Sequence, residues 1–231
     1  MKSFFTAALI AVLALFATSC YRSSVTELGD NLAKFTHRVD RTTELFGVKN
    51  TFNDVVMIEP VYQDINYSHG LIIASKGDLY DIYSAYGVKE FSHLKIKKVD
   101  YCEQYLEFET DEGLYLYFQG HELYGAFEDY DYYPGVDLLF YSLSKSCYGA
   151  CHAMIDETLV EPRYSVVVCA VDDAGDECFY FGDEKTIQKI VNNREVKLTK
   201  KQLSLLKKEA DAHNTPWPTK GYAVVYVKKL I

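Results

Sequence analysis

The chain has 231 residues, of which 48% are hydrophobic and 25% are charged. This is the profile of a globular protein, and it excludes a disordered or collagen-like chain. The formal net charge of −9 argues against a general nucleic-acid binder. Twenty tyrosines and thirteen phenylalanines favour strands over a helical bundle. We therefore expect a mainly β fold with a few helices, a β-rich α+β protein of short antiparallel strands and hairpins.

Residues 1–19 have the features of a signal peptide. The run from Phe4 to Ala17 is uncharged and almost wholly apolar, and it is shorter than the roughly 20 residues of a membrane-spanning helix. The tetrapeptide Ala17-Thr18-Ser19-Cys20 resembles the lipobox of bacterial lipoproteins, although Leu is commoner than Ala three residues before the cysteine and Gly or Ala is commoner than Ser directly before it. The resemblance implies that Cys20 carries fatty-acyl chains such as palmitate, which anchor the protein on a membrane of the cell envelope, outside the cytoplasm. An uncleaved anchor and a secreted protein cleaved near Ser19 are the alternatives.

Residues 20–47 should form a tether and an N-terminal helix over residues 24–46. Ser24 and Glu27 fit a capping box, and Gly47 is a suitable stop. One apolar seam follows helical spacing, through Val25, Leu28, Leu32, Phe35 and Val39. Such a helix would either pack on the body of the protein or pair with a partner or a second copy.

Residues 48–183 read as a tyrosine-rich antiparallel β region, with short apolar runs separated by Gly, Asp and Pro-Gly turns. An aromatic–glycine pair recurs at Phe46-Gly47, Tyr86-Gly87, Tyr124-Gly125 and Tyr148-Gly149. A longer repeated pattern begins at Asp64, Asp100 and Asp129. Each copy includes a later tyrosine, and these tyrosines, Tyr80, Tyr115 and Tyr148, are 35 and 33 residues apart. These strings resemble the WG-repeat proteins of bacterial envelopes, over residues 46–150 and without any Trp-Gly. The resemblance implies stacked β-hairpins and a binding role; an irregular β domain with accidental echoes is the alternative.

Residues 184–231 differ from the rest in composition. They hold eleven basic and four acidic residues, a net charge of +7, whereas residues 20–183 hold twelve and twenty-nine, a net charge of −17. The basic side chains could face anionic lipid headgroups or could simply be solvated. We expect helices over Glu184–Val191 and Thr199–His213, with Thr199 as a cap. Residues Gly221–Ile231 have apolar side chains on both faces, which predicts an inner strand that packs on the β region.

Five cysteines remain after Cys20, an odd number. Cys169 and Cys178 flank a turn, and a tight turn at Asp173-Ala174 would place them opposite each other for a disulfide. A bulged turn with Gly175 at positive φ would shift the register by one residue and separate them. Cys147 and Cys151 are the other disulfide candidates, or two buried thiols on a turn. Their string, which ends in His152, has one residue too many for a c-type haem site and no second ligand pair for a metal.

No catalytic motif, cofactor site or metal site is evident in the chain. The six histidines are scattered, and Asp172–Glu177 does not have the ligand order of a calcium loop. Tyrosine combines apolar area with a polar tip, which suits a binding surface, and cross-strand tyrosine pairs that stiffen a sheet are the alternative. The candidate binding residues are Tyr115, Tyr117, Tyr124, Tyr130, Tyr132 and Tyr133.

Three functions are compatible with these features. The first is a non-enzymatic envelope lipoprotein that binds a protein or glycan partner and no nucleic acid. The second is a hydrolase of envelope polysaccharide that uses a pair of Asp or Glu side chains. The third is a structural envelope subunit assembled through the 24–46 helix and a free cysteine.

Overall fold

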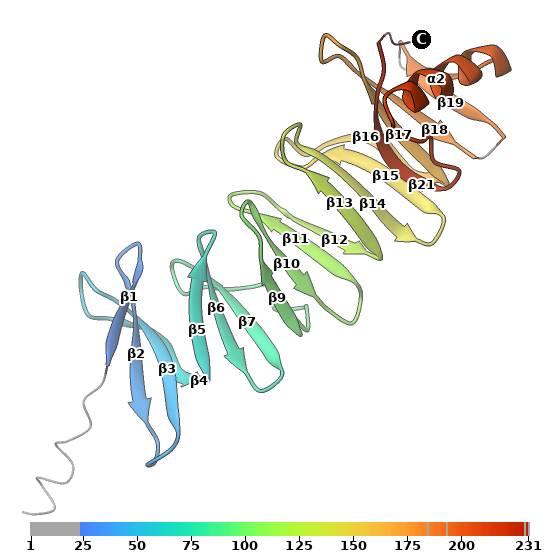
Figure 1. The fold of residues 1–231 in the computed structure, drawn as a ribbon. Coiled ribbons are helices and arrows are strands. Elements are labelled where there is room, and N and C mark those ends of the chain that lie inside the picture. Colours follow the sequence, from blue (N-terminus) through green and yellow to red (C-terminus); the bar gives the residue numbers. More distant parts are fainter. Residues whose placement is uncertain (1–23, 184, 193, 229, 231) are drawn as a thin grey trace, which may run out of the picture. The chain divides into compact units, whose positions relative to one another are not determined.

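The computed structural model describes residues 24–183, 185–192, 194–228 and 230. The chain divides into two compact units, residues 1–101 and residues 102–231. Within the described part the fold is mainly β with one α-helix, which confirms the predicted fold class (Figure 1). The predicted signal peptide and the lipidation candidate Cys20 lie outside the described residues.

The first unit contains two antiparallel sheets, each built from four consecutive strands. Sheet 1 consists of β1 (Val25–Gly29), β2 (Leu32–Arg38), β3 (Glu44–Asn50) and β4 (Val56–Tyr62). Sheet 2 consists of β5 (Asp64–Ser68), β6 (Leu71–Lys76), β7 (Leu79–Ser84) and β8 (Lys89–Glu90). Strand β9 (Lys98–Tyr101) ends the unit.

The helix predicted over residues 24–46 is wrong, because these residues form β1, β2 and the start of β3. The chain reverses between Gly29 and Leu32, which are paired, through Asp30 and Asn31 at φ values of 47° and 60°. A two-residue hairpin turn of this kind needs positive φ at both central positions, and Asp and Asn tolerate that conformation. The helical spacing of the apolar residues was coincidental, since Val25 at one end of the predicted seam is 51% exposed.

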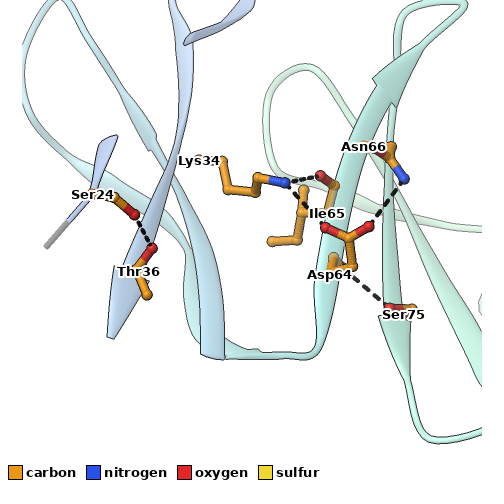
Figure 2. Close-up of polar contacts among 7 residues, drawn as sticks. All are labelled: Ser24, Lys34, Thr36, Asp64, Ile65, Asn66 and Ser75. Atoms are coloured by element: carbon orange, nitrogen blue, oxygen red, sulfur yellow. Dashed lines mark hydrogen bonds and ion pairs between the residues drawn. The ribbon is translucent and has the colours of Figure 1, made fainter. Parts of the chain in front are cut away.

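The two sheets of the first unit pack face to face. Their shared core contains Leu32, Val48, Ile58 and Tyr62 from sheet 1 with Ile65, Ile72 and Ala74 from sheet 2. At the margin, the Lys34 ammonium donates to Asp64 Oδ1 and to the Ile65 carbonyl oxygen, both at 3.0 Å (Figure 2). The Asp64 side chain is 55% exposed, so this ion pair contributes about 1 kcal/mol or less, and the apolar core dominates the packing.

The second unit contains three strand layers and a helix. The β10–β12 ladder consists of β10 (Tyr105–Glu109), β11 (Leu114–Phe118) and β12 (Leu123–Phe127). The β13–β16 sheet consists of β13 (Asp129–Tyr133), β14 (Leu138–Ser144), β15 (Cys147–His152) and β16 (Glu157–Tyr164). The β17 sheet has the order β20-β19-β18-β17-β21, with β17 (Val166–Val171), β18 (Glu177–Gly182), β19 (Ile187–Val191), β20 (Arg194–Lys197) and β21 (Gly221–Tyr226). The helix is α2 (Lys200–Ala212).

Strand β17 shows how these layers stack. All six of its residues are buried, because both faces of its sheet are covered. Val166, Val168 and Ala170 pack in the core shared with Leu206 and Ala210 of α2, whereas the alternate residues pack in the core shared with the β13–β16 sheet. A third core joins that sheet to the β10–β12 ladder. The unit is therefore stabilised by successive apolar layers.

The C-terminal predictions are partly confirmed. Helix α2 forms as expected, and the Thr199 hydroxyl accepts from the Gln202 amide in a capping box. The helix predicted over Glu184–Val191 is wrong: the Asp183 carboxylate accepts from two backbone amides of the following turn, and the chain then enters strand β19. Strand β21 packs on the β region, but it lies at the edge of its sheet, parallel to β17, and its two apolar faces reflect the two layers that cover the sheet.

The four aromatic–glycine pairs lie on β3, in the turn after β7, on β12 and on β15. Three of the four aromatic–glycine pairs lie in strands where another chain segment approaches too closely for a side chain. A Cβ at Gly47 would lie 2.6 Å from the Ile58 carbonyl oxygen, and one at Gly149 would lie 2.8 Å from that of Val160. Gly87 instead occupies a turn at a φ of 78°. Close packing between neighbouring strands thus explains three of the four recurring glycines.

Candidate functional site

Three of the candidate binding tyrosines lie between two layers of the second unit. Tyr124, Tyr130 and Tyr132 join Tyr105 and Phe118 in an aromatic cluster between the β10–β12 ladder and the β13–β16 sheet. The ring centroids of Phe118 and Tyr132 are 5.1 Å apart, and those of Tyr105 and Tyr130 are 6.1 Å apart. Their edge-to-face geometry is the arrangement that aromatic rings favour in cores. These side chains mainly hold two layers together.

The hydroxyl groups of this cluster are satisfied by nearby oxygen atoms. The Tyr132 hydroxyl donates to Asp137 Oδ1 at 3.0 Å, and the Tyr130 hydroxyl donates to Glu107. Burial raises the pKa of both phenols, and the acceptor carboxylates raise it further. The phenols therefore stay protonated and serve as hydrogen-bond donors within the protein.

The other three candidate tyrosines lie apart from the cluster. Tyr115 and Tyr117 point to the opposite face of β11, since the buried residues of that strand are Leu116 and Phe118. Tyr133 faces the β17 sheet and packs on Phe140, with 5.8 Å between ring centroids. The six tyrosines do not form one continuous surface.

A cleft of about 350 Å³ opens between the two layers that the aromatic cluster joins. Strand β12 supplies Tyr124 and Phe127, β14 supplies Tyr141, and β15 supplies Cys151. Strand β16 and the turn before it supply four of the other lining residues. The remaining lining residues are Glu122, Leu123, Gly125, Leu143, Asp156, Thr158, Glu161 and Pro162.

The cleft combines aromatic walls with an acidic rim. Three carboxylates line it, those of Glu122, Asp156 and Glu161, and no lysine or arginine is among its described lining residues. The Tyr124 hydroxyl lies 3.2 Å from Asp156 Oδ1 and 2.8 Å from the Ala153 carbonyl oxygen. Arg163 lies nearby in sequence, but its guanidinium donates to Glu195 Oε1 at 2.6 Å. The negative charge of the rim is therefore not compensated from within the cleft.

Cys151 lines the cleft with a thiol that is not in a disulfide. The residue is 6% exposed, and its thiol makes no hydrogen bond with any described residue. Burial, together with the negative charges of Asp137 and Asp156, raises the pKa of this thiol to about 12. The group is thus a neutral thiol at physiological pH and a poor nucleophile.

The predicted disulfides do not form, and all five described cysteines are free thiols. The β17–β18 hairpin takes the bulged turn, with Gly175 at a φ of 86°, and pairs Cys169 with Phe179 and Cys178 with Ala170. The two cysteines are thus one residue out of register. Cys147 and Cys151 lie four residues apart on strand β15, about 13 Å along an extended chain, which exceeds the roughly 7 Å limit for a disulfide.

A second cleft, of about 420 Å³, lies beside β16 and β18 in the same unit. Arg163 and Lys197 line it, but Arg163 is paired with Glu195, and the Asp183 carboxylate is occupied by backbone amides. Within the described residues, no group of His, Cys, Asp and Glu side chains is arranged to hold a metal ion. The aromatic, acidic cleft is therefore the stronger candidate site.

The sequence contained little signal for this cleft. The tyrosine content indicates Tyr124, but the spacing of Cys151, Asp156 and Glu161 does not indicate a shared site, since they come from different strands or turns and meet only through strand pairing.

The described part of the chain contains no helix with the length and apolarity that crossing a membrane would require.

Comparisons with known proteins give no functional assignment. No protein-family model matches the chain, and no curated protein matches it. Among solved structures, Hsv2 from Kluyveromyces lactis is 14% identical over 72% of this chain and 60% of its own length, with a TM-score of 0.29. A protein of unknown function from Bacteroides thetaiotaomicron is 12% identical over 75% of this chain and 56% of its own, with a TM-score of 0.23. The chain thus spans less than two thirds of either protein, and likeness at these scores assigns neither fold nor function.

Proposed function

We propose that this chain is a lipid-anchored protein of the bacterial cell envelope that binds a protein or glycan partner without catalysing a reaction. The observation that supports binding is the cleft of about 350 Å³ in the second unit. Its volume lies at the lower end of the range for ligand sites, and it combines aromatic walls with a few polar groups. Such a cleft fits one side chain or a small group of a larger partner.

The anchor is proposed from the lipobox-like sequence that ends at Cys20. Several acyl chains on one residue give stable membrane attachment, since each buried CH₂ group adds about 0.8 kcal/mol. Mass spectrometry of the purified protein should find an N-terminal Cys20 that carries fatty acids. Cys20→Ala should abolish palmitate incorporation and Ser23→Ala should not, whereas an intact leader or an unacylated N-terminus would contradict the anchor.

Binding through the cleft can be tested by site-specific crosslinking. A photo-crosslinking amino acid at Thr158, an exposed residue of the cleft wall, should capture a partner in the envelope. The same amino acid at Ser204, which is exposed on α2, serves as the matched control. A partner captured equally at both positions, or at neither, would argue against the cleft as the binding site.

The polysaccharide hydrolase is kept as a second candidate because three carboxylates line the cleft. It predicts release of reducing ends from envelope polysaccharide and loss of that release in Glu161→Gln. The binding proposal expects that the wild-type protein releases no reducing ends. The structural-subunit alternative relied on a helix over residues 24–46 and on a free cysteine, and residues 24–46 form strands instead of that helix.

A further inference from the structure

The cleft also indicates the chemistry of its occupant. We infer that it accepts a cationic side chain, lysine or arginine, presented by a protein partner. This inference rests on the proposed binding function and specifies the class of partner, and it is argued from the charge, the rings and the buried thiol of one cavity.

The carboxylates of the rim form no ion pair within the described part of the chain. Those of Glu122 and Glu161 accept no hydrogen bond from a described residue, although the Arg163 guanidinium acts on Glu161 through its charge, and Asp156 is approached by a single phenol, that of Tyr124. An incoming ammonium or guanidinium group would form charge-assisted hydrogen bonds with them. An anionic ligand would be repelled, so the rim favours positive charge.

The walls of the cleft suit the same kind of group. The rings of Phe127 and Tyr141 lie 4.9 Å apart between centroids at an interplanar angle of 37°, and Tyr124 adds a third ring. Aromatic faces attract cations and also pack against an alkyl stem. A lysine or arginine side chain offers both parts, a cation at its tip and methylene groups behind it.

The Cys151 thiol is an independent feature of the lining. This side chain is more than nine-tenths buried, lines the cleft and has no hydrogen-bond partner among the described residues. Sulfur is a weak acceptor, so it can face the N–H groups of a cation without excluding the apolar stem. The lining therefore offers a weak acceptor beside the aromatic rings, which agrees with an occupant that has both N–H donors and an apolar stem.

The test is a binding titration of the full chain, purified in detergent, with tetralysine as the probe. The wild-type protein should bind tetralysine, and the peptide acetylated on all four lysines should not bind. The variant Glu122→Gln/Asp156→Asn/Glu161→Gln should weaken binding at least tenfold. The matched control, Glu157→Gln/Asp173→Asn/Asp211→Asn, removes three exposed carboxylates outside the cleft and should retain wild-type affinity.

Several outcomes would overturn the inference. Equal loss of affinity in both triple variants would show that the probe responds only to the overall negative charge. Binding of the acetylated peptide would show that no cation is recognised, and displacement of tetralysine by equimolar spermidine would favour a free polyamine over a partner side chain. Circular dichroism and thermal unfolding verify that each variant folds. A triple variant of the cleft that fails to fold is replaced by Thr158→Trp, which should block the cleft and abolish binding, whereas unchanged binding would overturn the inference.

The inference and the proposed function can fail separately. If crosslinking at Thr158 captures an envelope partner whose binding is unaffected by the cleft triple variant, the cation inference fails and the binding function stands. If tetralysine binds as expected but no envelope partner is captured at Thr158, the proposed function fails and the cation site stands.

Discussion

Truncation of Phe118 should strongly destabilise the second unit. Phe118 is fully buried, and its ring centroid lies 5.1 Å from Tyr132, 5.4 Å from Tyr105 and 6.0 Å from Tyr124. Replacing a buried Phe by Ala costs about 3–5 kcal/mol of stability. Because Phe118→Ala also removes three ring pairs, each worth about 0.5–1.5 kcal/mol, we expect a loss near the upper end of that range. Because total stability is typically about 5–15 kcal/mol, Phe118→Ala should lower the melting temperature by on the order of 15 °C.

Trp217 provides the assay. It is the only tryptophan of the chain, it packs on Tyr180 in the core beneath α2, and its fluorescence therefore reports the unfolding of the second unit. Urea titrations of Phe118→Ala and of the control Ile155→Ala, whose side chain is 66% exposed, should differ by several kcal/mol, with the control within about 0.5 kcal/mol of wild type. A loss below about 1 kcal/mol for Phe118→Ala would refute the role of the aromatic cluster.

Four further predictions concern separate features. Gly149→Ala should destabilise by about 1–3 kcal/mol, because a Cβ would lie 2.8 Å from a carbonyl oxygen of the neighbouring strand, whereas Gly135→Ala, with open space, should be neutral in the same titration. Thr199→Ala should cost about 1 kcal/mol by removing the cap of α2, and Ser204→Ala on the exposed face of the helix should not destabilise; equal losses would contradict capping. Two backbone amides that donate to Asp40 lower the pKa of its carboxyl to about 2, so its stabilising contribution is complete above about pH 4 and is lost as the pH falls towards 2; a carboxyl resonance that titrates near pH 4 would contradict this. Thiol titration in denaturant without reductant should count five free thiols in the processed, lipidated chain, and a count of three would reveal a disulfide.

Local chemistry explains which elements the sequence predicted well. The segment after Thr199 has a cap, a reciprocal Gln202 and an apolar face, and these signals act within one helical turn. The tyrosine-rich runs from Tyr105 to Phe118 predicted strands for a similar reason, since their side chains fit a pleated surface. The fold class could therefore be predicted from the sequence without knowledge of any long-range contact.

The mistaken helices have a common physical origin. Residues 25–46 carry apolar positions that fit helical spacing, and such short patterns do not distinguish a helix from strands linked by tight turns. In residues 24–46 the Asp30-Asn31 turn reverses the chain and produces a hairpin. In residues 184–191 the turn after Asp183 leads into strand β19. In both, a few polar side chains and backbone angles outweighed the apolar pattern.

The candidate site was largely beyond sequence reasoning. The tyrosines were identified as important, but whether Tyr132 faces solvent or a neighbouring sheet depends on which layer covers its strand. Cys151 and Glu161 are ten residues apart in sequence, yet they line one cavity because β15 pairs with β16. No spacing rule anticipates that arrangement.

By itself, the sequence determined that the chain is β-rich, that a capped helix forms near its C-terminus and that glycine recurs after aromatic residues. Strand propensity, capping and turn chemistry act between near neighbours, so these features need no long-range contact. Only the tertiary structure decided that the tyrosines join two layers, that the cysteines stay apart and that three carboxylates meet around aromatic walls. These features depend on strand register and layer packing, where a shift of one residue moves a side chain to the opposite face of a sheet.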